Sequence, residues 1–129
     1  MAWQPLDVEA QQDALLAEVG TFDPTWEYVL FDDDPAEGGM ELASDGGYVA
    51  QSAAGVSWAV EVGEPAVTAD VDFTHSGGGW SGVAQWWGLR RPDASVPFAE
   101  PLSELVDVND ETPAGTVTVS LVLGYRFDY

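Results

Sequence analysis

The sequence contains no cysteine and no lysine, and its single histidine is His75. Without cysteine there is neither a disulfide framework nor a thiolate nucleophile, and one histidine is too few ligands for a typical zinc site. No serine lies in a G-x-S-x-G elbow, so an acyl-transfer triad around His75 has no recognisable nucleophile. We therefore expect a protein that is not an enzyme and that needs no cofactor.

Basic residues are almost absent as well. Arg90, Arg91 and Arg126 stand against 23 aspartates and glutamates, which gives a formal net charge of −20. Nucleic acids and anionic membrane surfaces are bound by clustered lysine and arginine, so we expect neither as a partner. No apolar run is long enough to span a membrane, and residues 1–6 have no basic or apolar region typical of an export signal. We expect no membrane insertion and no classical export.

The excess of acid has two explanations that the sequence leaves open. Absence of lysine with abundant Asp and Glu resembles the proteins of halophilic archaea that accumulate salt, and of their viruses. Repulsion within such a chain weakens at molar salt, where the Debye length falls to about 3 Å. The alternative is a GC-rich gene of a bacterium, such as an actinobacterium, or of its phage, because GC-rich codons favour Ala, Gly, Val and Asp over Lys.

What the chain does contain predicts a folded, mainly β protein. Its 129 residues, of which 46% are hydrophobic, suit one domain over 1–129 with one core. A short helix is predicted over 7–19, with Asp7 as its N-cap, Gly20 as its C′ stop, and an apolar stripe of Val8, Leu15, Leu16 and Val19. We expect this helix to pack on a face or edge of a sheet.

The remaining segments alternate apolar and polar residues, as strands do, and are separated by loops that include 32–39 and 92–101. Residues 81–90 are apolar on both faces, which predicts a central strand. Because adjacent strand residues point to opposite faces, at least one of Trp86 and Trp87 is expected in the core. Seven short strands with regular turns predict an antiparallel β-sandwich of jelly-roll-like form. The predicted strands are 26–31, 47–53, 56–62, 67–74, 81–90, 102–108 and 116–127.

Two acidic clusters have the oxygen ligands that calcium or another hard cation prefers, although neither has the spacing of an EF-hand. One comprises Asp32, Asp33, Asp34 and Glu37, and the other Asp107, Asp110 and Glu111. A solvated acidic surface is the default interpretation of both, because close carboxylate pairs are unavoidable among so many acids, and a cation site is the alternative.

Residues 80–91 (W-S-G-V-A-Q-W-W-G-L-R-R) combine tryptophan with arginine. These two types dominate protein–protein hot spots, so Trp80, Trp86, Arg90 and Arg91 are candidate interaction residues. Exposed, coplanar Trp80 and Trp86 would instead favour sugar stacking. The other alternative is that these tryptophans are structural.

A longer pattern resembles a known family. Residues 28–42 read Y-V-L-F-D-D-D-P-A-E-G-G-M-E-L and residues 46–53 read G-G-Y-V-A-Q-S-A. With the preceding helix, this order resembles the small tail-fibre or minor tail proteins of tailed phages. That family's F-x-x-A-x-G-x-W-G-x-V-x-x-W-G-L pattern is matched at Phe73, Gly79, Trp80, Gly82, Val83, Trp87, Gly88 and Leu89. The chain departs from the family at Gln51, where a basic residue is usual, and at 109–112, which replace an N-x-G-D-T turn.

The resemblance implies a virion protein without a known active site, located at the tail tip, on tail fibres or as a capsid decoration. With the halophilic interpretation, the expected source is a haloarchaeal tailed virus. Its expected role is assembly, with attachment to the host surface as a further role. Expected partners are other virion proteins, further copies in a trimer or a five- or sixfold ring, and a host glycan or glycoprotein. A free-standing carbohydrate-binding β-sandwich is the alternative.

Overall fold

The computed structural model describes residues 7–43, 45–76, 79–80, 82–108 and 114–124. Its first element is the helix α1 (Val8–Val19), which begins where the Asp7 carboxylate accepts a hydrogen bond of 2.7 Å from the Ala10 N–H. The predicted helix is thus confirmed, but its buried face differs from the predicted apolar stripe. Leu15 and Val19 are buried, whereas Val8 is exposed and Gln11 takes a buried position instead.

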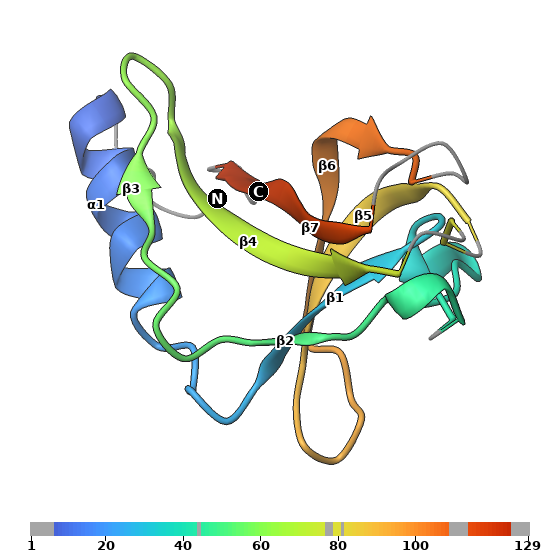
Figure 1. Ribbon diagram of the computed structural model, residues 1–129. Coiled ribbons are helices and arrows are strands. Elements are labelled where there is room, and N and C mark those ends of the chain that lie inside the picture. Colours follow the sequence, from blue (N-terminus) through green and yellow to red (C-terminus); the bar gives the residue numbers. More distant parts are fainter. Residues whose placement is uncertain (1–6, 44, 77–78, 81, 109–113, 125–129) are drawn as a thin grey trace.

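Gly20 ends the helix, but in a right-handed conformation (φ −66°) and not in the left-handed one that a C′ glycine usually supplies. Two hydrogen bonds of 2.8 Å from the Gln12 side chain to the carbonyls of Glu61 and Glu64 tie the helix to the loop after β3. Figure 1 shows α1 standing beside β3, so the helix packs at an edge of a sheet, as predicted.

Seven strands follow, and they form two antiparallel sheets. One sheet has the order β2-β1-β5-β6 and the other the order β3-β4-β7 (Figure 1). This confirms the predicted mainly β, antiparallel, sandwich-like fold with one helix near the N-terminus, and β5 is an internal strand, as predicted. The bounds are β1 (Glu27–Phe31), β2 (Gln51–Ser52), β3 (Ala59–Val60), β4 (Ala66–His75), β5 (Ala84–Arg90), β6 (Phe98–Val106) and β7 (Gly115–Gly124).

Alternation predicted the long strands well. β4 and β7 pair along their whole length, and each turns its apolar residues to the core and its hydroxyls and carboxylates outward. The outward residues are cross-strand neighbours that hydrogen-bond: Ser120 donates to Asp70 at 2.8 Å and Thr118 donates to Asp72 at 2.6 Å. The predicted Tyr125 and Phe127 of the last strand lie outside the described residues.

The segment 56–62 is not the half-buried strand that its alternation predicts. Only β3 is paired there, both its residues are exposed, and Val62 is 94% exposed. Val56 and Trp58 are partly buried against the core, and the Trp58 indole N–H donates to the Tyr28 hydroxyl at 3.0 Å. The alternation is present, but the segment pairs with β4 at two residues only. The predicted strand at 47–53 shrinks likewise to β2.

Strand β6 begins earlier than predicted. It starts at Phe98 and includes Pro101, inside the stretch 92–101 that the sequence assigns to a loop. Proline is tolerated there because β6 is the edge strand of its sheet. The loop 32–39 also contains a one-turn helix, η1 (Pro35–Glu37), and a second turn, η2 (Asp45–Gly47), precedes β2.

The core lies between the two sheets and is rich in aromatic rings. Trp87 of β5 is fully buried, as predicted, with ring centroids 5.9 Å from Tyr28, 5.7 Å from Trp58 and 5.7 Å from Phe98. Its indole N–H donates to the Val122 carbonyl at 3.2 Å and so links the two sheets. Val119 and Leu121, predicted to pack with Trp87, are buried in the same cluster.

Candidate functional site

The predicted interaction residue Trp80 is a core residue. It is 8% exposed, and its ring lies edge-on to Tyr48 and to Phe73, with centroids 5.8 and 6.4 Å away. Its indole N–H donates to the Thr74 carbonyl at 3.1 Å, so even its polar atom is used within the fold. This corrects the interaction assignment. It also removes the exposed tryptophan pair on which a sugar-stacking surface would rest.

The neighbouring candidate Trp86 is half-buried on β5. It lies opposite Phe31 of β1 and Pro101 of β6, on the face of its sheet away from Trp87. The interpretation that at least one of the two adjacent tryptophans is in the core is therefore confirmed by Trp87. Trp86 retains a partly exposed surface that a partner can contact.

Arg90 is partly buried and forms ion pairs with two carboxylates. Its guanidinium lies 3.2 Å from the Glu27 carboxylate and forms a second ion pair with Glu41. The Tyr48 hydroxyl joins the network by donating to Glu41 at 2.9 Å and accepting from the Leu30 N–H at 3.0 Å. Arg90 is thus a structural cation that links β1, β5 and the segment after η1, which corrects its assignment as a free interaction residue.

Burial raises the pKa of the Tyr48 hydroxyl well above its usual value. The hydrogen bond from the Leu30 N–H acts in the opposite direction but does not outweigh the burial. Tyr48 is 1% exposed and its ring stacks on Phe73 at a centroid distance of 6.0 Å. No local pattern predicts this network, because Glu41 is 49 residues from Arg90.

Arg91 is the exposed arginine of the pair, and its guanidinium lies 5.4 Å from the centroid of the Trp26 ring. Beside it is a hollow of about 200 Å³ that we call the aromatic hollow, defined by Phe22, Trp26, Arg91, Pro97 and Phe98. Its position brings together the turn after α1, the start of β1 and the ends of the loop between β5 and β6. The sequence-based prediction included Arg91 but not the aromatic residues around it.

The loop between β5 and β6 has a defined shape next to this hollow. The Arg91 N–H donates to the Ser95 carbonyl at 2.9 Å, and Ala94 adopts a left-handed conformation with φ +71°. Asp93 accepts two hydrogen bonds from Ser95, from its hydroxyl at 2.6 Å and its N–H at 3.0 Å, and these lower the pKa of the carboxyl. The loop therefore presents Arg91 from a turn with its own internal bonds.

The first acidic cluster forms turns and not a cation site. Asp32 accepts from the Met40 N–H at 2.8 Å, Asp33 from the Asp34 N–H at 2.8 Å, and Asp34 from the Ala36 N–H at 2.9 Å. Nowhere in the described ranges do three or more His, Asp or Glu side chains gather as metal ligands would. The four candidate ligands Asp32, Asp33, Asp34 and Glu37 therefore do not gather around one point in this structure.

The second acidic cluster is only partly described. Asp107 follows β6 and is exposed, whereas Asp110 and Glu111 lie outside the described residues. His75, the only histidine of the chain, is 4% exposed at the end of β4, and its Nε2 accepts a hydrogen bond of 2.9 Å from the Gly79 N–H. This hydrogen bond links the histidine to the segment that follows β4.

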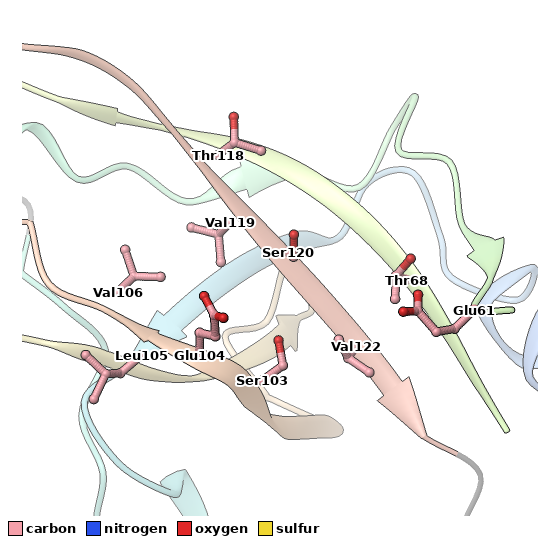
Figure 2. Close-up of a pocket in the computed structure, with 10 residues that line it drawn as sticks. All are labelled: Glu61, Thr68, Ser103, Glu104, Leu105, Val106, Thr118, Val119, Ser120 and Val122. Carbon is pink, nitrogen blue, oxygen red and sulfur yellow. The ribbon is translucent and has the colours of Figure 1, made fainter. Parts of the chain in front are cut away.

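A larger hollow of about 390 Å³ lies beside β6 and β7 (Figure 2). Figure 2 shows Thr118 and Val119 on opposite sides of the β7 ribbon, as expected for successive strand residues. The hollow presents hydroxyls, two carboxylates and aliphatic groups. Its lining residues are Glu61, Thr68, Ser103, Glu104, Leu105, Val106, Thr118, Val119, Ser120 and Val122.

Comparison with family models, with curated proteins and with solved structures finds no match to this chain. Among the described residues, no helix has the length and apolar character needed to cross a membrane.

Proposed function

We propose that this chain is a non-enzymatic structural component of a tailed-virus particle, at the tail tip, on a fibre or as a capsid decoration. The observation that supports this is the position of the residues that carry the resemblance to small tail proteins. They are the residues on which this fold depends. Tyr28, Leu30, Phe73, Trp80, Trp87 and Leu89 are all buried in one cluster.

Three glycines of the same pattern occupy positions where a side chain would collide. A Cβ at Gly39 would lie 2.1 Å from the Asp33 carbonyl oxygen, and a Cβ at Gly46 would lie 1.8 Å from that of Gly79. At Gly88 it would lie 2.6 Å from the Phe31 ring. The pattern therefore specifies close backbone packing, which is what a family-wide fold requires, and a shared fold favours a shared structural role.

Assembly is the mechanism we propose, with the aromatic hollow and the partly exposed Trp86 as contact surfaces. Tryptophan and arginine at a rim of aromatic side chains are the residue types that dominate protein–protein hot spots. The partners would be further copies of the chain, in a trimer or a five- or sixfold ring, other virion proteins, and in a second role a host-surface glycan or glycoprotein.

The oligomer is tested by light scattering coupled to size exclusion in 2 M KCl. We expect a trimer, pentamer or hexamer whose mass falls to that of the monomer in Arg91→Glu. The control is Asp13→Ala, which changes an exposed position of α1 outside the lining of the hollow. A wild-type protein that is monomeric at high concentration would contradict the oligomer.

The virion assignment is tested by fractionating the lysate of an infected host. An antibody against the chain should detect it in particles that have been banded in a density gradient and washed with high salt. A chain found only among the unassembled proteins of the lysate would contradict the proposal.

A further inference from the structure

Strand β4 is longer than the strand that pairs with it on one side. β7 pairs with all ten of its residues, whereas β3 pairs only with Val67 and Thr68. The Glu61 N–H donates to the Ala66 carbonyl at 3.0 Å, so the main-chain groups of Ala66 point to the β3 side. Because strand residues alternate, those of Thr68, Asp70 and Asp72 point the same way.

The unpaired part of this edge is a short window. At its far end the Ser76 N–H donates to the Gly46 carbonyl at 2.9 Å, and the Thr74 hydroxyl donates to the Gly47 carbonyl. Between β3 and this turn, no described residue is paired with the main chain of Asp70 or Asp72 on the β3 side. Two N–H groups and two carbonyls are therefore available in the pattern that an added strand would use.

There is space for such a strand. A hollow of about 500 Å³ lies next to the window, lined on one side by Asp70, Val71 and Asp72. The other side is formed by small and polar residues of the segment from β2 onward, namely Gln51, Ser52, Ala54, Gly55, Val56 and Ser57. A strand adds at about 4.8 Å from its neighbour and advances about 3.3 Å per residue, so the window accepts about three or four extended residues.

We propose that this edge of β4 binds an extended segment of another protein that carries basic side chains at alternate positions. The main-chain window provides the binding, as in other cases of strand addition. The selectivity comes from Asp70 and Asp72, which are exposed on the outer face of the sheet. Side chains of an added strand would lie about 5 Å from them as cross-strand neighbours, where opposite charge is favourable.

Both carboxylates are already fixed on their other side. Their Oδ1 atoms accept the hydroxyl hydrogen bonds of Ser120 and Thr118, which holds each carboxylate above the sheet beside the open edge. An added strand with acidic side chains would place negative charges next to these carboxylates. An added strand with apolar side chains would place methyl groups there, which cannot pair with the carboxylates. The edge thus discriminates by charge as well as by shape.

The occupant is a different protein and not a second copy of this chain. The chain has no lysine, and its three arginines include only the adjacent pair Arg90 and Arg91 and the distant Arg126, so no basic residues stand at alternate positions. Arg90 is also held by Glu27 and Glu41, and Arg91 lies on Trp26. This inference rests on the proposed assembly role and deepens it by naming the chemistry of one partner.

The test is a titration of the full chain with acetyl-TKVKVT-amide, followed by calorimetry in KCl of about 0.5 M. Binding should weaken about tenfold in Asp70→Asn/Asp72→Asn, whose amide oxygens can still accept from Ser120 and Thr118. The control pair Glu9→Gln/Asp13→Asn removes the same charge from exposed positions of α1 and should leave the affinity unchanged. Acetyl-TEVEVT-amide should not bind.

Amide hydrogen exchange locates the binding. The N–H groups of Asp70 and Asp72 should exchange fast in the free protein and become protected by the lysine peptide, and a peptide N-methylated on its pairing edge should protect neither. Protection of both amides in the free protein would overturn the proposal, because the edge would already be covered. Equal binding of the glutamate peptide, or none of the lysine peptide, would overturn it too. Neither result bears on whether the chain is found in particles.

Discussion

Tyr48→Phe tests the account of the buried network. The substitution keeps the ring that stacks on Phe73 and removes the hydroxyl, which bonds to the Leu30 N–H and to Glu41. The Leu30 N–H is then left in the core without an acceptor, at a cost of about 1–3 kcal/mol. Glu41 keeps its ion pair with Arg90 and is partly exposed, so its share of the loss is small.

Tyr28→Phe is the matched control, because it removes the same atom from another buried tyrosine. The Tyr28 hydroxyl accepts from the Trp58 indole, which is only half-buried and can turn to water. We expect a loss of about 0.5–1.5 kcal/mol there, less than for Tyr48→Phe. Urea unfolding in 2 M KCl followed by tryptophan fluorescence measures both. A Tyr48→Phe protein as stable as the wild type, or more stable than Tyr28→Phe, would refute the reasoning.

The same tyrosine gives a pH dependence with a definite sign. Its pKa is raised in the folded state, so above the ordinary tyrosine pKa of about 10 the unfolded chain loses a proton that the folded chain keeps. The stabilisation is complete below pH of about 10 and declines as the pH rises further. Wild-type stability should fall between about pH 10 and 11.5 with a steeper slope than that of Tyr48→Phe. Equal slopes for the wild type and Tyr48→Phe would mean that other groups cause the loss of stability at alkaline pH.

Three further predictions concern the core, the turns and the charge. Trp87→Ala should cost about 3–5 kcal/mol in urea unfolding, because it empties a fully buried site and breaks the bond to Val122, whereas Trp86→Ala should cost far less; equal costs would contradict the assigned faces of β5. Gly46→Ala should prevent stable folding, because its Cβ meets the Gly79 carbonyl, and Gly55→Ala, with similar φ and open space, should cost only about 1–2 kcal/mol by circular dichroism melts; a tolerated Gly46→Ala would refute the close approach. The melting temperature should rise steadily from 0.05 to 2 M KCl, since most of the 23 acids have no basic partner and salt screens their repulsion. Millimolar calcium at constant ionic strength should raise it no further. A melting temperature that does not change with salt would favour codon bias as the explanation of the acidic composition.

The sequence predicted the parts of the fold that local pattern determines. In β4 and β7 apolar residues alternate with hydroxyls and aspartates, and both strands find a partner along their length. The same alternation at 56–62 failed, because this segment pairs with β4 at two residues only and leaves the rest of that edge unpaired. Val62 therefore lies 94% exposed despite its apolar side chain.

The interaction residues could be predicted only in part. Arg90 and Arg91 are adjacent and of one type, yet one is enclosed by carboxylates from distant segments and the other lies over Trp26. Trp80 was predicted to be an interaction residue because of its residue type, but its ring packs against Tyr48 and Phe73. Such differences depend on contacts between residues far apart in the sequence, which periodicity does not encode.

The acidic loop shows the opposite case, in which a local signal was present and predicted a loop with a solvated acidic surface, a cation site being the alternative. Aspartates before Pro35 and Gly38 are typical of turns in which the carboxylate accepts from a nearby N–H. Asp33 and Asp34 form such bonds within their own turn.

The central claim is that the chain is a building block of a virus particle, and electron cryo-microscopy of intact particles tests it most directly. The account predicts density for the two-sheet domain at symmetry-related positions, with a neighbouring chain of another protein added along β4 beside Asp70 and Asp72. A particle map in which every protein density is accounted for by other chains would contradict it.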